Sequence, residues 1–446
     1  MSSRTAAAKR LAHTANHITK PLITPVNKQQ LYNHYQRPIP NELKYLNSLP
    51  AKTLFSYFAI GCCTINKPVL NTVIKLFPYI PFSILNFFIG DIYIGGSTPD
   101  QVIKKTEQLN NRGINNVLLS LTIENSEGSN QNIDINYIVD ETVQSLHSIL
   151  KPQILTKLQN AQDVNEIAPS YIVLKPSALV DSPVSVLSYP DAKENKSNWE
   201  FLVNNCNKVT EHVERLNKEF KELFPERKAS FFITCVDAEN FAMQQGVYKL
   251  QRELFQKFNK INKPVQVVGT VQMYLRSSIP QIELEDKIAK QQGYKVGLKL
   301  VRGAYIHSEP DRDVIFATKE ETDANYDTGV NQIVSQLDTK QTNIDHLVIA
   351  THNKKSSLSL LNQITPQNES KLIVGQLLGM ADELSYELIN DLKFKKLIKY
   401  VPWGPPLETK DYLLRRLQEN GDAVRNDNGW KLIFNIFRVL KLKVFG

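Results

Sequence analysis

Short apolar runs alternate with longer amphipathic segments along the chain between residues 115 and 405. The runs are rich in β-branched residues, and several are apolar almost throughout, which is typical of parallel strands buried on both faces. Segments such as 238–258 and 281–292 instead space their apolar residues as helices do. The pattern therefore predicts strands at 117–124, 171–180, 231–237, 265–274, 296–305, 346–353, 372–380 and 398–403.

This alternation favours one fold class over two others. Eight strand–helix units in roughly 300 residues fit a (β/α)8 barrel better than an open doubly wound sheet. No GxGxxG follows a predicted strand and no GxxxxGK[ST] occurs, which weakens the dinucleotide-sheet and P-loop alternatives. We therefore expect an α/β protein whose TIM-type barrel occupies residues 113–428.

The composition excludes several other classes of protein. Of the 446 residues, 42% are hydrophobic and 22% are charged, which is ordinary for a globular protein and unlike a fibrous or disordered chain. Four cysteines, with Cys62 and Cys63 adjacent, make neither a disulfide scaffold nor a CxxC zinc site. The best apolar stretch, Leu54–Cys63, is much shorter than the roughly 18–20 residues of a spanning helix.

The net charge of +8 comes from the two ends of the chain. Residues 1–40 and 429–446 are rich in lysine and arginine and contain no acidic residue, so residues 41–428 carry a small net negative charge. A nucleic-acid-binding protein normally carries its positive charge on a folded face. We therefore expect no nucleic-acid partner.

Each end suggests a function of its own. Residues 1–25 are rich in Ser, Thr, Ala and basic residues, which indicates a mitochondrial transit peptide; a disordered basic tail is the alternative. Residues 429–446 interleave large apolar residues with cations. Such a segment lies at an anionic membrane surface, or it docks on the body as a terminal helix with its cations in water. The apolar segment 80–94 leaves the same two alternatives open.

Polar residues follow several predicted strands, where the chemistry of a (β/α)8 barrel is found. These residues are Lys175, Asp237, Gln272, Arg302 and His352. Lys175 and Asp237 could form a Schiff-base pair as in barrel aldolases, but that lysine would need an apolar pocket to depress its pKa. The spacing of six between His346 and His352 fits no common ligand motif, so we expect no metal site.

Three segments are specific enough to indicate a family. They are KLVRGAY at 299–305, ATHN at 350–353, and YVPWGP at 400–405 followed by LLRRLQEN at 413–420. Together they resemble the proline dehydrogenase (proline oxidase) family of the eukaryotic mitochondrial type, over about residues 90–425. The resemblance implies a distorted (β/α)8 barrel behind a helical arm at 26–112. It also implies an FAD enzyme that oxidises L-proline to Δ1-pyrroline-5-carboxylate, with a quinone as acceptor, on the matrix side of the inner mitochondrial membrane.

The resemblance also implies roles for individual residues. The proline carboxylate would be bound by Lys175, Arg415 and Arg416. The proline ring would be enclosed by Tyr274, Leu377 and Tyr400. Asp237 would join the catalytic set, as one candidate to accept the amine proton, with water as the other. The FAD would be bound by Asp237, Gln272, Arg302, Gly303, Ala304, Thr318, Lys319, Glu320, His352, Asn353, Gln376 and Glu419.

The chemistry of these residues agrees with the resemblance. Guanidinium groups match a carboxylate bidentately, so Arg415 and Arg416 can hold one small anion between them, although a solvated basic helix face is the common alternative. Glu419 lies one helical turn beyond Arg415 and can orient it. A fixed cation such as Arg302 near a flavin stabilises the negative charge of its reduction. The phenol of Tyr400 would fill the space that a 4-hydroxyl group on proline needs.

Two competing functions remain open on the sequence alone. One is a 4-hydroxyproline-oxidising member of the same family. The other is a catalytically silent, membrane-peripheral binding protein on the same barrel.

Overall fold

Eight parallel strands close into one barrel in sequence order, with β1 paired to β8. The computed structural model describes residues 41–123, 134–306, 308–337, 339, 341–424 and 429–445. The expected (β/α)8 barrel is confirmed, and each predicted strand corresponds to one observed strand. The strands are β1 Asn116–Leu121, β2 Ser170–Leu174, β3 Phe232–Val236, β4 Val267–Gln272, β5 Val296–Val301, β6 Ile344–Ala350, β7 Leu372–Leu377 and β8 Leu397–Trp403.

Several strands end before the apolar runs that predicted them. β2 ends at Leu174, because Lys175 and Pro176 lead into a short 3-10 turn whose residues remain buried. β5 ends at Val301, since the chain then turns through Gly303 with a φ of 157°. After β2, burial thus continues past the strand into the βα loop, and an apolar run alone cannot mark that boundary.

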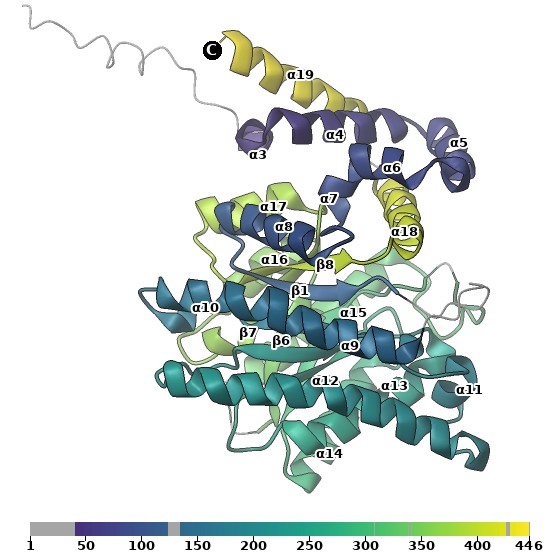
Figure 1. Ribbon diagram of the computed structural model, residues 1–446, viewed down its shortest axis with the longest axis vertical. Helices are drawn as coiled ribbons and strands as arrows, with labels where there is room; N and C mark the ends of the chain where they lie inside the picture. Colours follow the sequence, from purple (N-terminus) through teal and green to yellow (C-terminus); the bar gives the residue numbers. More distant parts are fainter. Residues whose placement is uncertain are drawn as a thin grey trace, which may run out of the picture.

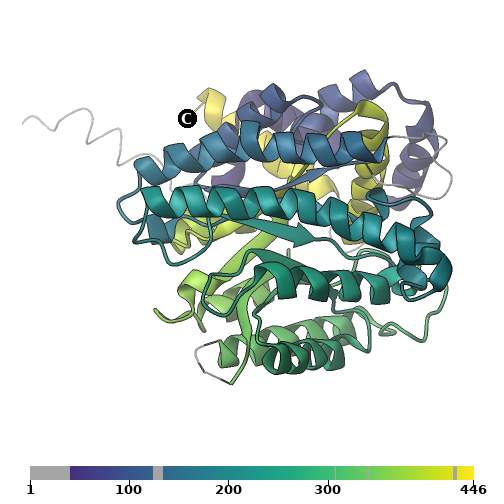
Figure 2. The same cartoon turned by 60° about the horizontal axis from the view of Figure 1, so that its bottom comes forward.

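Helices surround the barrel, with α9, α12 and α13 side by side on one flank (Figures 1 and 2). Side-chain caps fix where several of them begin; for example, Asn240 Oδ1 accepts from the backbone N–H of Met243 at the start of α13. The helices over residues 99–424 are α8 Pro99–Asn111, α9 Ile135–Ser145, α10 Lys151–Gln159, α11 Pro183–Ser188, α12 Lys196–Leu223, α13 Phe241–Phe258, α14 Ser278–Gln292, α15 Lys319–Gln336, α16 Lys354–Leu361, α17 Asp382–Tyr386 and α18 Pro406–Val424.

Two apolar cores meet at the barrel wall. Residues such as Leu118, Ile373 and Ile398 form a cluster inside the barrel. Their strand neighbours, such as Leu119 and Val374, belong to the larger cluster between the strands and the helices. Alternating orientation along each strand therefore separates an interior face, which leads to the barrel mouth, from an outer face.

A layer of helices from both ends of the chain lies over one side of the barrel (Figure 1). It contains α3 Asn41–Ser48, α4 Ala51–Cys63, α5 Lys67–Leu76, α6 Phe82–Leu85, α7 Asp91–Tyr93 and α19 Gly429–Phe445. Ile436 and Val439 of α19 are buried against Leu46 and Leu54. Among the described residues, no helix is both long and apolar enough to cross a membrane. The expected transit peptide at 1–25 lies outside the described residues.

Candidate active site

Four polar side chains meet inside the barrel, close to the carboxyl ends of the strands. Nζ of Lys299 on β5 lies 2.5 Å from Oδ1 of Asp237, the residue that follows β3. The hydroxyl of Tyr400 on β8 lies 2.9 Å from Oδ2 of Asp237 and 2.8 Å from Oγ of Ser120 on β1. The sequence predicted Asp237 and Tyr400 as site residues, and the structure brings them into direct contact.

Lys299 is fully charged in this setting. Burial lowers its pKa, but the adjacent carboxylate of Asp237 more than offsets this effect, and the net pKa lies above the ordinary value for lysine. Asp237 is thus held in an ion pair with a protonated lysine from a neighbouring part of the barrel.

A second set of contacts joins the three loops that follow β2, β3 and β5. The carboxylate of Glu239 accepts from the backbone N–H of Ser177 at 3.0 Å and lies 3.2 Å from the Tyr305 hydroxyl. Gln272 at the end of β4 donates to the carbonyl of Glu239 and accepts from the backbone N–H of Ala304. The loops after β2, β3 and β5 are therefore fixed to one another. Both the NH2 group and the oxygen of the Gln272 amide take part in these contacts.

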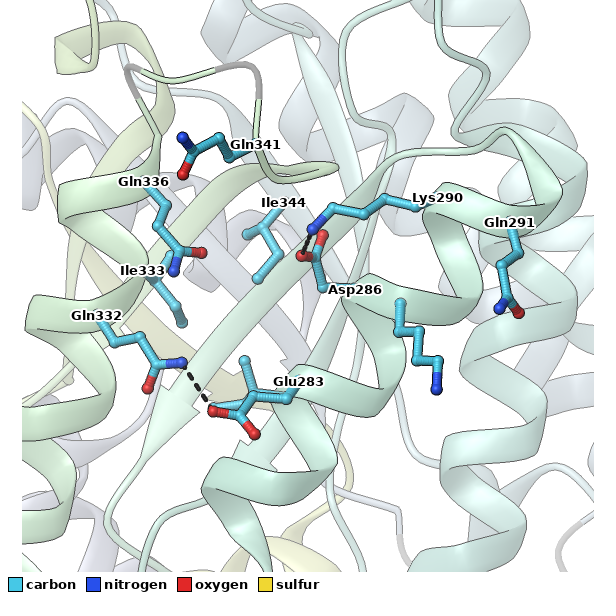
Figure 3. A pocket seen from close by; sticks show the side chains of 11 residues that line it. Glu283, Asp286, Lys290, Gln291, Gln332, Ile333, Gln336, Gln341 and Ile344 are labelled. Atoms are coloured by element: carbon cyan, nitrogen blue, oxygen red, sulfur yellow. Dashed lines mark hydrogen bonds and ion pairs between the residues drawn. The ribbon is translucent and has the colours of Figure 1, made fainter.

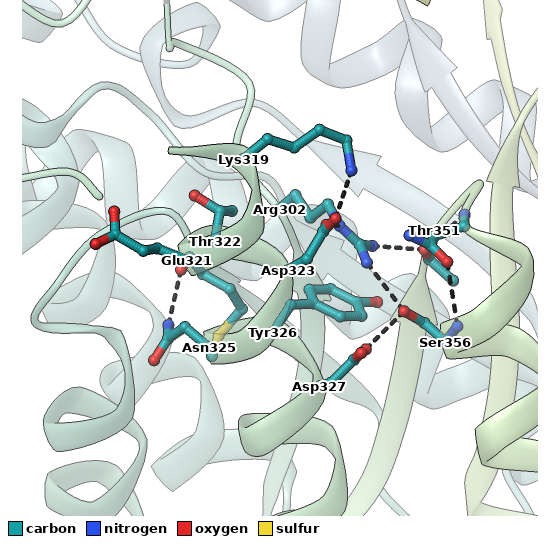
Figure 4. A network of polar contacts seen from close by, with 12 residues as sticks. Arg302, Lys319, Glu321, Thr322, Asp323, Asn325, Tyr326, Asp327, Thr351 and Ser356 are labelled. Carbon is teal, nitrogen blue, oxygen red and sulfur yellow. Dashed lines mark hydrogen bonds and ion pairs between the residues drawn. The ribbon is translucent and has the colours of Figure 1, made fainter. Parts of the chain in front are cut away.

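Arg302, directly after β5, reaches the first turns of two helices (Figure 4). Its Nε lies 2.5 Å from Oδ1 of Asp323 on α15, while Nη1 and Nη2 lie 2.6 and 2.9 Å from the hydroxyls of Thr351 and Ser356. The guanidinium also lies 4.2 Å from the ring centroid of Tyr326. Burial raises the pKa of Asp323, but hydrogen bonds from Lys319 and Arg302 outweigh it, and the net pKa is lowered. The result is a rigid, charged Arg302–Asp323 pair.

His352, after β6, is a neutral hydrogen-bond acceptor. Its Nε2 accepts from the backbone N–H of Leu377 at 3.0 Å. Burial, with the positive charges of Lys399, Arg416 and Arg302 nearby, lowers the pKa of His352 to about 3. The proton therefore sits on Nδ1 at neutral pH, and the ring joins the ends of β6 and β7.

The two arginines of α18 lie in different surroundings. Arg416 is only 8% exposed and its guanidinium lies 4.9 Å from the ring centroid of Tyr412, whereas Arg415 is exposed. The positive charge of Arg416 is one of those that lower the pKa of His352, so this guanidinium lies near the end of β6. The backbone of Glu419 continues α18, but its side chain lies outside the described part of the chain.

The residues predicted to enclose the proline ring are not equivalent. Leu377, the last residue of β7, pairs with Tyr400 in the middle of β8, and both are half-buried. Tyr274 is buried, with its hydroxyl 2.6 Å from Glu309. A Cβ at Gly303 would lie 2.3 Å from the ring of Tyr274. Position 303 therefore requires glycine because the ring of Tyr274 packs closely against its backbone.

The remaining predicted cofactor residues lie in three places. Thr318 is the N-cap of α15 and forms a capping box with Glu321, so Thr318, Lys319 and Glu320 form an exposed helix start. Asn353 caps α16 through a hydrogen bond from the backbone N–H of Ser356. Gln376 faces the outside of the barrel, where its Oε1 lies 2.5 Å from the Ser385 hydroxyl.

A surface cavity lies at the opposite end of the barrel (Figure 3). Its volume is about 440 Å³, and residues of α14 and α15 line it together with Ile344, the first residue of β6. In this fold, residues at the amino ends of the strands normally contribute to stability and not to catalysis. No group of three or more potential metal ligands occurs among the described residues.

Sequence reasoning missed Lys299, Asp323, Ser120 and Tyr305 as members of these networks. A signal existed for Lys299, because a lysine inside an apolar strand run must be buried or paired. Asp323 and Tyr305 lay within the motifs already singled out. Nothing in the sequence distinguishes Ser120 from other strand serines.

Comparison with known proteins agrees with this arrangement. The family model described as "Proline dehydrogenase" matches residues 102–428. "Proline dehydrogenase 1, mitochondrial" of Dictyostelium discoideum is 27% identical over 459 residues, covering 94% of this chain and 77% of that protein. The human protein of the same name is 32% identical over 201 residues, covering 43% of this chain and 32% of that protein. Among solved structures, proline utilization A of Bdellovibrio bacteriovorus matches with a TM-score of 0.65 at 17% identity, covering 88% of this chain and 43% of that one. The structural match shows the shared fold.

Proposed function

The chain belongs to the proline dehydrogenase family, and from this premise we propose that it oxidises L-proline to Δ1-pyrroline-5-carboxylate in the first step of proline catabolism. The observation that carries the proposal is the extent of the family match. Residues 102–428 include all eight strands and all of α18. The match therefore covers every strand end from which a barrel enzyme builds its site.

The proline carboxylate is bound by Arg415, Arg416 and Lys175. The guanidinium of Arg416 is buried near the end of β6 and has lost most of its water, so a charge-assisted contact with a carboxylate is strongly favoured there. Leu377 and Tyr400 enclose the ring of the substrate. Tyr274 contributes to this enclosure indirectly, because its ring packs against Gly303 in the loop after β5.

The amine proton of proline is released to water in this scheme. Asp237 already accepts from Tyr400 and pairs with Lys299 at 2.5 Å, so protonating it would break a buried ion pair. The part played by Asp237 is instead to hold the Tyr400 ring against the substrate. Fixed positioning of this kind is a large contribution that a protein makes to such a reaction.

The cofactor is FAD, which supplies the acceptor for the hydride from proline C5. Arg302 fits a role beside the flavin, because three of its N–H groups are donated to Asp323, Thr351 and Ser356, and a guanidinium has five. Gln272, Gly303 and Ala304 form the adjoining loop. The group toward the adenosine is Thr318, Lys319 and Glu320 at the start of α15, and His352, Asn353, Asp237 and Glu419 complete the set.

The electrons leave to a quinone, and the protein associates peripherally with the matrix side of the inner mitochondrial membrane. Support for the organelle comes from the relatives described as mitochondrial in Dictyostelium discoideum, Schizosaccharomyces pombe and Homo sapiens. Support for the membrane comes from the basic, apolar helix α19. Mass spectrometry of the organellar protein should find that about the first 20–30 residues have been removed.

The proposal is tested by the colour of the purified protein. We expect a yellow protein that bleaches without oxygen when L-proline is added, and acid release of its chromophore should yield FAD. A colourless protein that takes up no flavin would support the silent binding protein. Faster dye reduction with trans-4-hydroxyproline than with proline would support the other substrate. Release of FMN would overturn the assignment of the α15 segment to adenosine.

A further inference from the structure

A row of aromatic rings, made of two contacting sets that meet on α4, crosses three elements of the helical layer. The ring centroids of Phe437 on α19 and Phe58 on α4 lie 5.8 Å apart. Phe55, one turn before Phe58, lies 5.9 Å from Phe88 in the π-helical segment η2, Asn86–Gly90. Phe88 in turn lies 5.2 Å from Phe87. Segments more than 300 residues apart in the sequence thus share one apolar surface.

Three of the five rings of this surface are exposed, and Phe58 and Phe88 are half-buried. Phe437, Phe55 and Phe87 are 57%, 50% and 59% exposed. The outward side of α19 adds Trp430 and Phe434, while its opposite side is buried on α3 and α4. Further exposed apolar side chains of the layer are Val69, Leu76, Tyr79, Ile84, Leu440, Leu442 and Val444. An exposed apolar surface this extensive normally marks an interaction site.

The charge around the aromatic row is predominantly positive. Residues 51–90 and 429–446 contain no aspartate or glutamate, and Asp91, which directly follows η2, is paired with Lys52. Their cations are Lys52, Lys67, Lys75, Lys431, Arg438, Lys441 and Lys443. Apolar side chains interleaved with cations match a bilayer surface that carries anionic headgroups, which takes up both.

We propose that α4, α5, η2 and α19 form one composite face that binds an anionic lipid surface. The inference specifies the membrane contact suggested with the proposed function, but it does not depend on proline oxidation. A second copy of the chain is a poorer occupant, because two such faces would bring like charges together. The two segments act jointly, since α19 reaches this face only by packing on α4.

The composite face also lies against the helix that carries the arginines. Tyr412 and Leu413 of α18 are buried in one cluster with Ile60, Phe77 and Leu85. Nζ of Lys410 donates to the carbonyls of Pro78 and Ile80 at 2.6 and 2.8 Å. A lipid surface bound there would therefore lie next to the substrate helix.

Tryptophan fluorescence of the full-length holoenzyme provides the readout. Trp430 is 61% exposed, whereas Trp199 and Trp403 are 6% and 3% exposed. We expect its emission to shift to the blue with vesicles of phosphatidylcholine containing about one third phosphatidylglycerol, and less with phosphatidylcholine alone. The Trp430→Phe variant should bind equally in flotation but show no shift.

Matched substitutions locate the surface. Phe434→Ser and Phe87→Ser should each weaken vesicle binding by at least about tenfold. Lys75→Gln with Lys441→Gln should weaken it about fivefold per lysine at low salt. The controls are Leu223→Ser at the end of α12, and Lys193→Gln with Lys196→Gln, which are exposed side chains outside this face.

Each outcome of these experiments either supports or overturns the proposed lipid-binding face. Absence of vesicle binding, or equal losses in the control variants, would overturn it. A dimer in light scattering that Phe434→Ser dissociates, without lipid binding, would assign the face to a second copy. Proline-dependent dye reduction in solution should be unchanged in all of these variants, so a failure of lipid binding and a failure of the proposed oxidation are separately visible.

Discussion

Lys299 and Asp237 form a largely buried ion pair in the barrel, with Nζ 2.5 Å from Oδ1, and Tyr400 donates to the other oxygen of the same carboxylate. The lysine comes from β5, the aspartate follows β3, and the tyrosine comes from β8. Three separate strands thereby determine where the phenol ring lies. The ion pair is a device for positioning a residue at the barrel mouth.

Removing the lysine should cost both stability and turnover. Lys299→Met leaves Asp237 buried without its cation, which should lower the free energy of unfolding by about 3–5 kcal/mol. Because the folded pKa of Lys299 is raised, the pair contributes fully below the unfolded lysine pKa of about 10.4 and loses its contribution as the pH rises through the folded value. Urea unfolding from neutral pH to about pH 9 should therefore give a constant difference between wild type and variant.

The control for this prediction is a double-mutant cycle with Asp237→Asn. The double variant should be more stable than the sum of the two single losses allows, since neither charge is then left alone. Additive losses would mean that the two groups do not interact in the folded protein.

The arginines of α18 should affect substrate binding more than cofactor binding. Arg415→Met and Arg416→Met should each raise KM for proline by roughly 10- to 150-fold, the cost of about 1.5–3 kcal/mol for a charge-assisted contact. Steady-state kinetics together with the flavin absorbance per protein measure both quantities. Arg215→Met, at an exposed position of α12, is the control. An unchanged KM in both variants would identify the pair as a solvated basic face.

The barrel could be predicted because its signal is repeated along the chain. Each strand is an apolar run and each helix an amphipathic one, so an error of a few residues at one boundary leaves the topology intact. The strand ends were less predictable. Lys175 to Ala178 stay largely buried without strand pairing, because the loops of this mouth pack on one another.

The identity of the site residues could be predicted from the sequence, but the contacts between their side chains could not. Asp237 and Tyr400 were both expected at the mouth, yet their hydrogen bond depends on the register of β8 against β1 and on Lys299 from a third strand. The outward orientation of Gln376 shows the same limit: a shift of one residue moves a strand side chain to the other face. One-dimensional patterns do not carry that information.

A second buried charge cluster should dominate the acid stability of the protein. Asp382 lies 2.8 Å from Nζ of Lys399 and 3.1 Å from Nη2 of Arg112, and Tyr45 on α3 donates to it at 2.9 Å. Burial raises the pKa of Asp382, but the two cations outweigh it and the net pKa lies well below the ordinary value. Its contribution is therefore present above the unfolded pKa of about 3.9 and is lost as the pH falls through the folded value.

Asp382→Asn should consequently destabilise the protein by about 3–5 kcal/mol at neutral pH, and the deficit should shrink in acid. Urea unfolding between about pH 3 and 7 measures this difference. Asp191→Asn, which removes an exposed ion pair with Lys249, should change stability by no more than about 1 kcal/mol. A deficit that is independent of pH would place the loss in packing.

Substrate choice should depend on the ring of Tyr400. Hydrogen-bonding distances to Asp237 and Ser120 fix its hydroxyl, so the ring cannot easily move aside for a 4-hydroxyl group on the substrate. We expect wild type to prefer proline over trans-4-hydroxyproline by at least about 10-fold in kcat/KM, or roughly 1.4 kcal/mol. Tyr400→Ser should narrow this ratio, mainly by weakening proline turnover and partly by admitting the hydroxyl. Tyr400→Phe keeps the ring and should keep the preference while lowering both rates, because the contact with Asp237 is lost. If wild type prefers hydroxyproline, or if Tyr400→Ser leaves the ratio unchanged, Tyr400 is part of the barrel wall and another residue discriminates between the substrates.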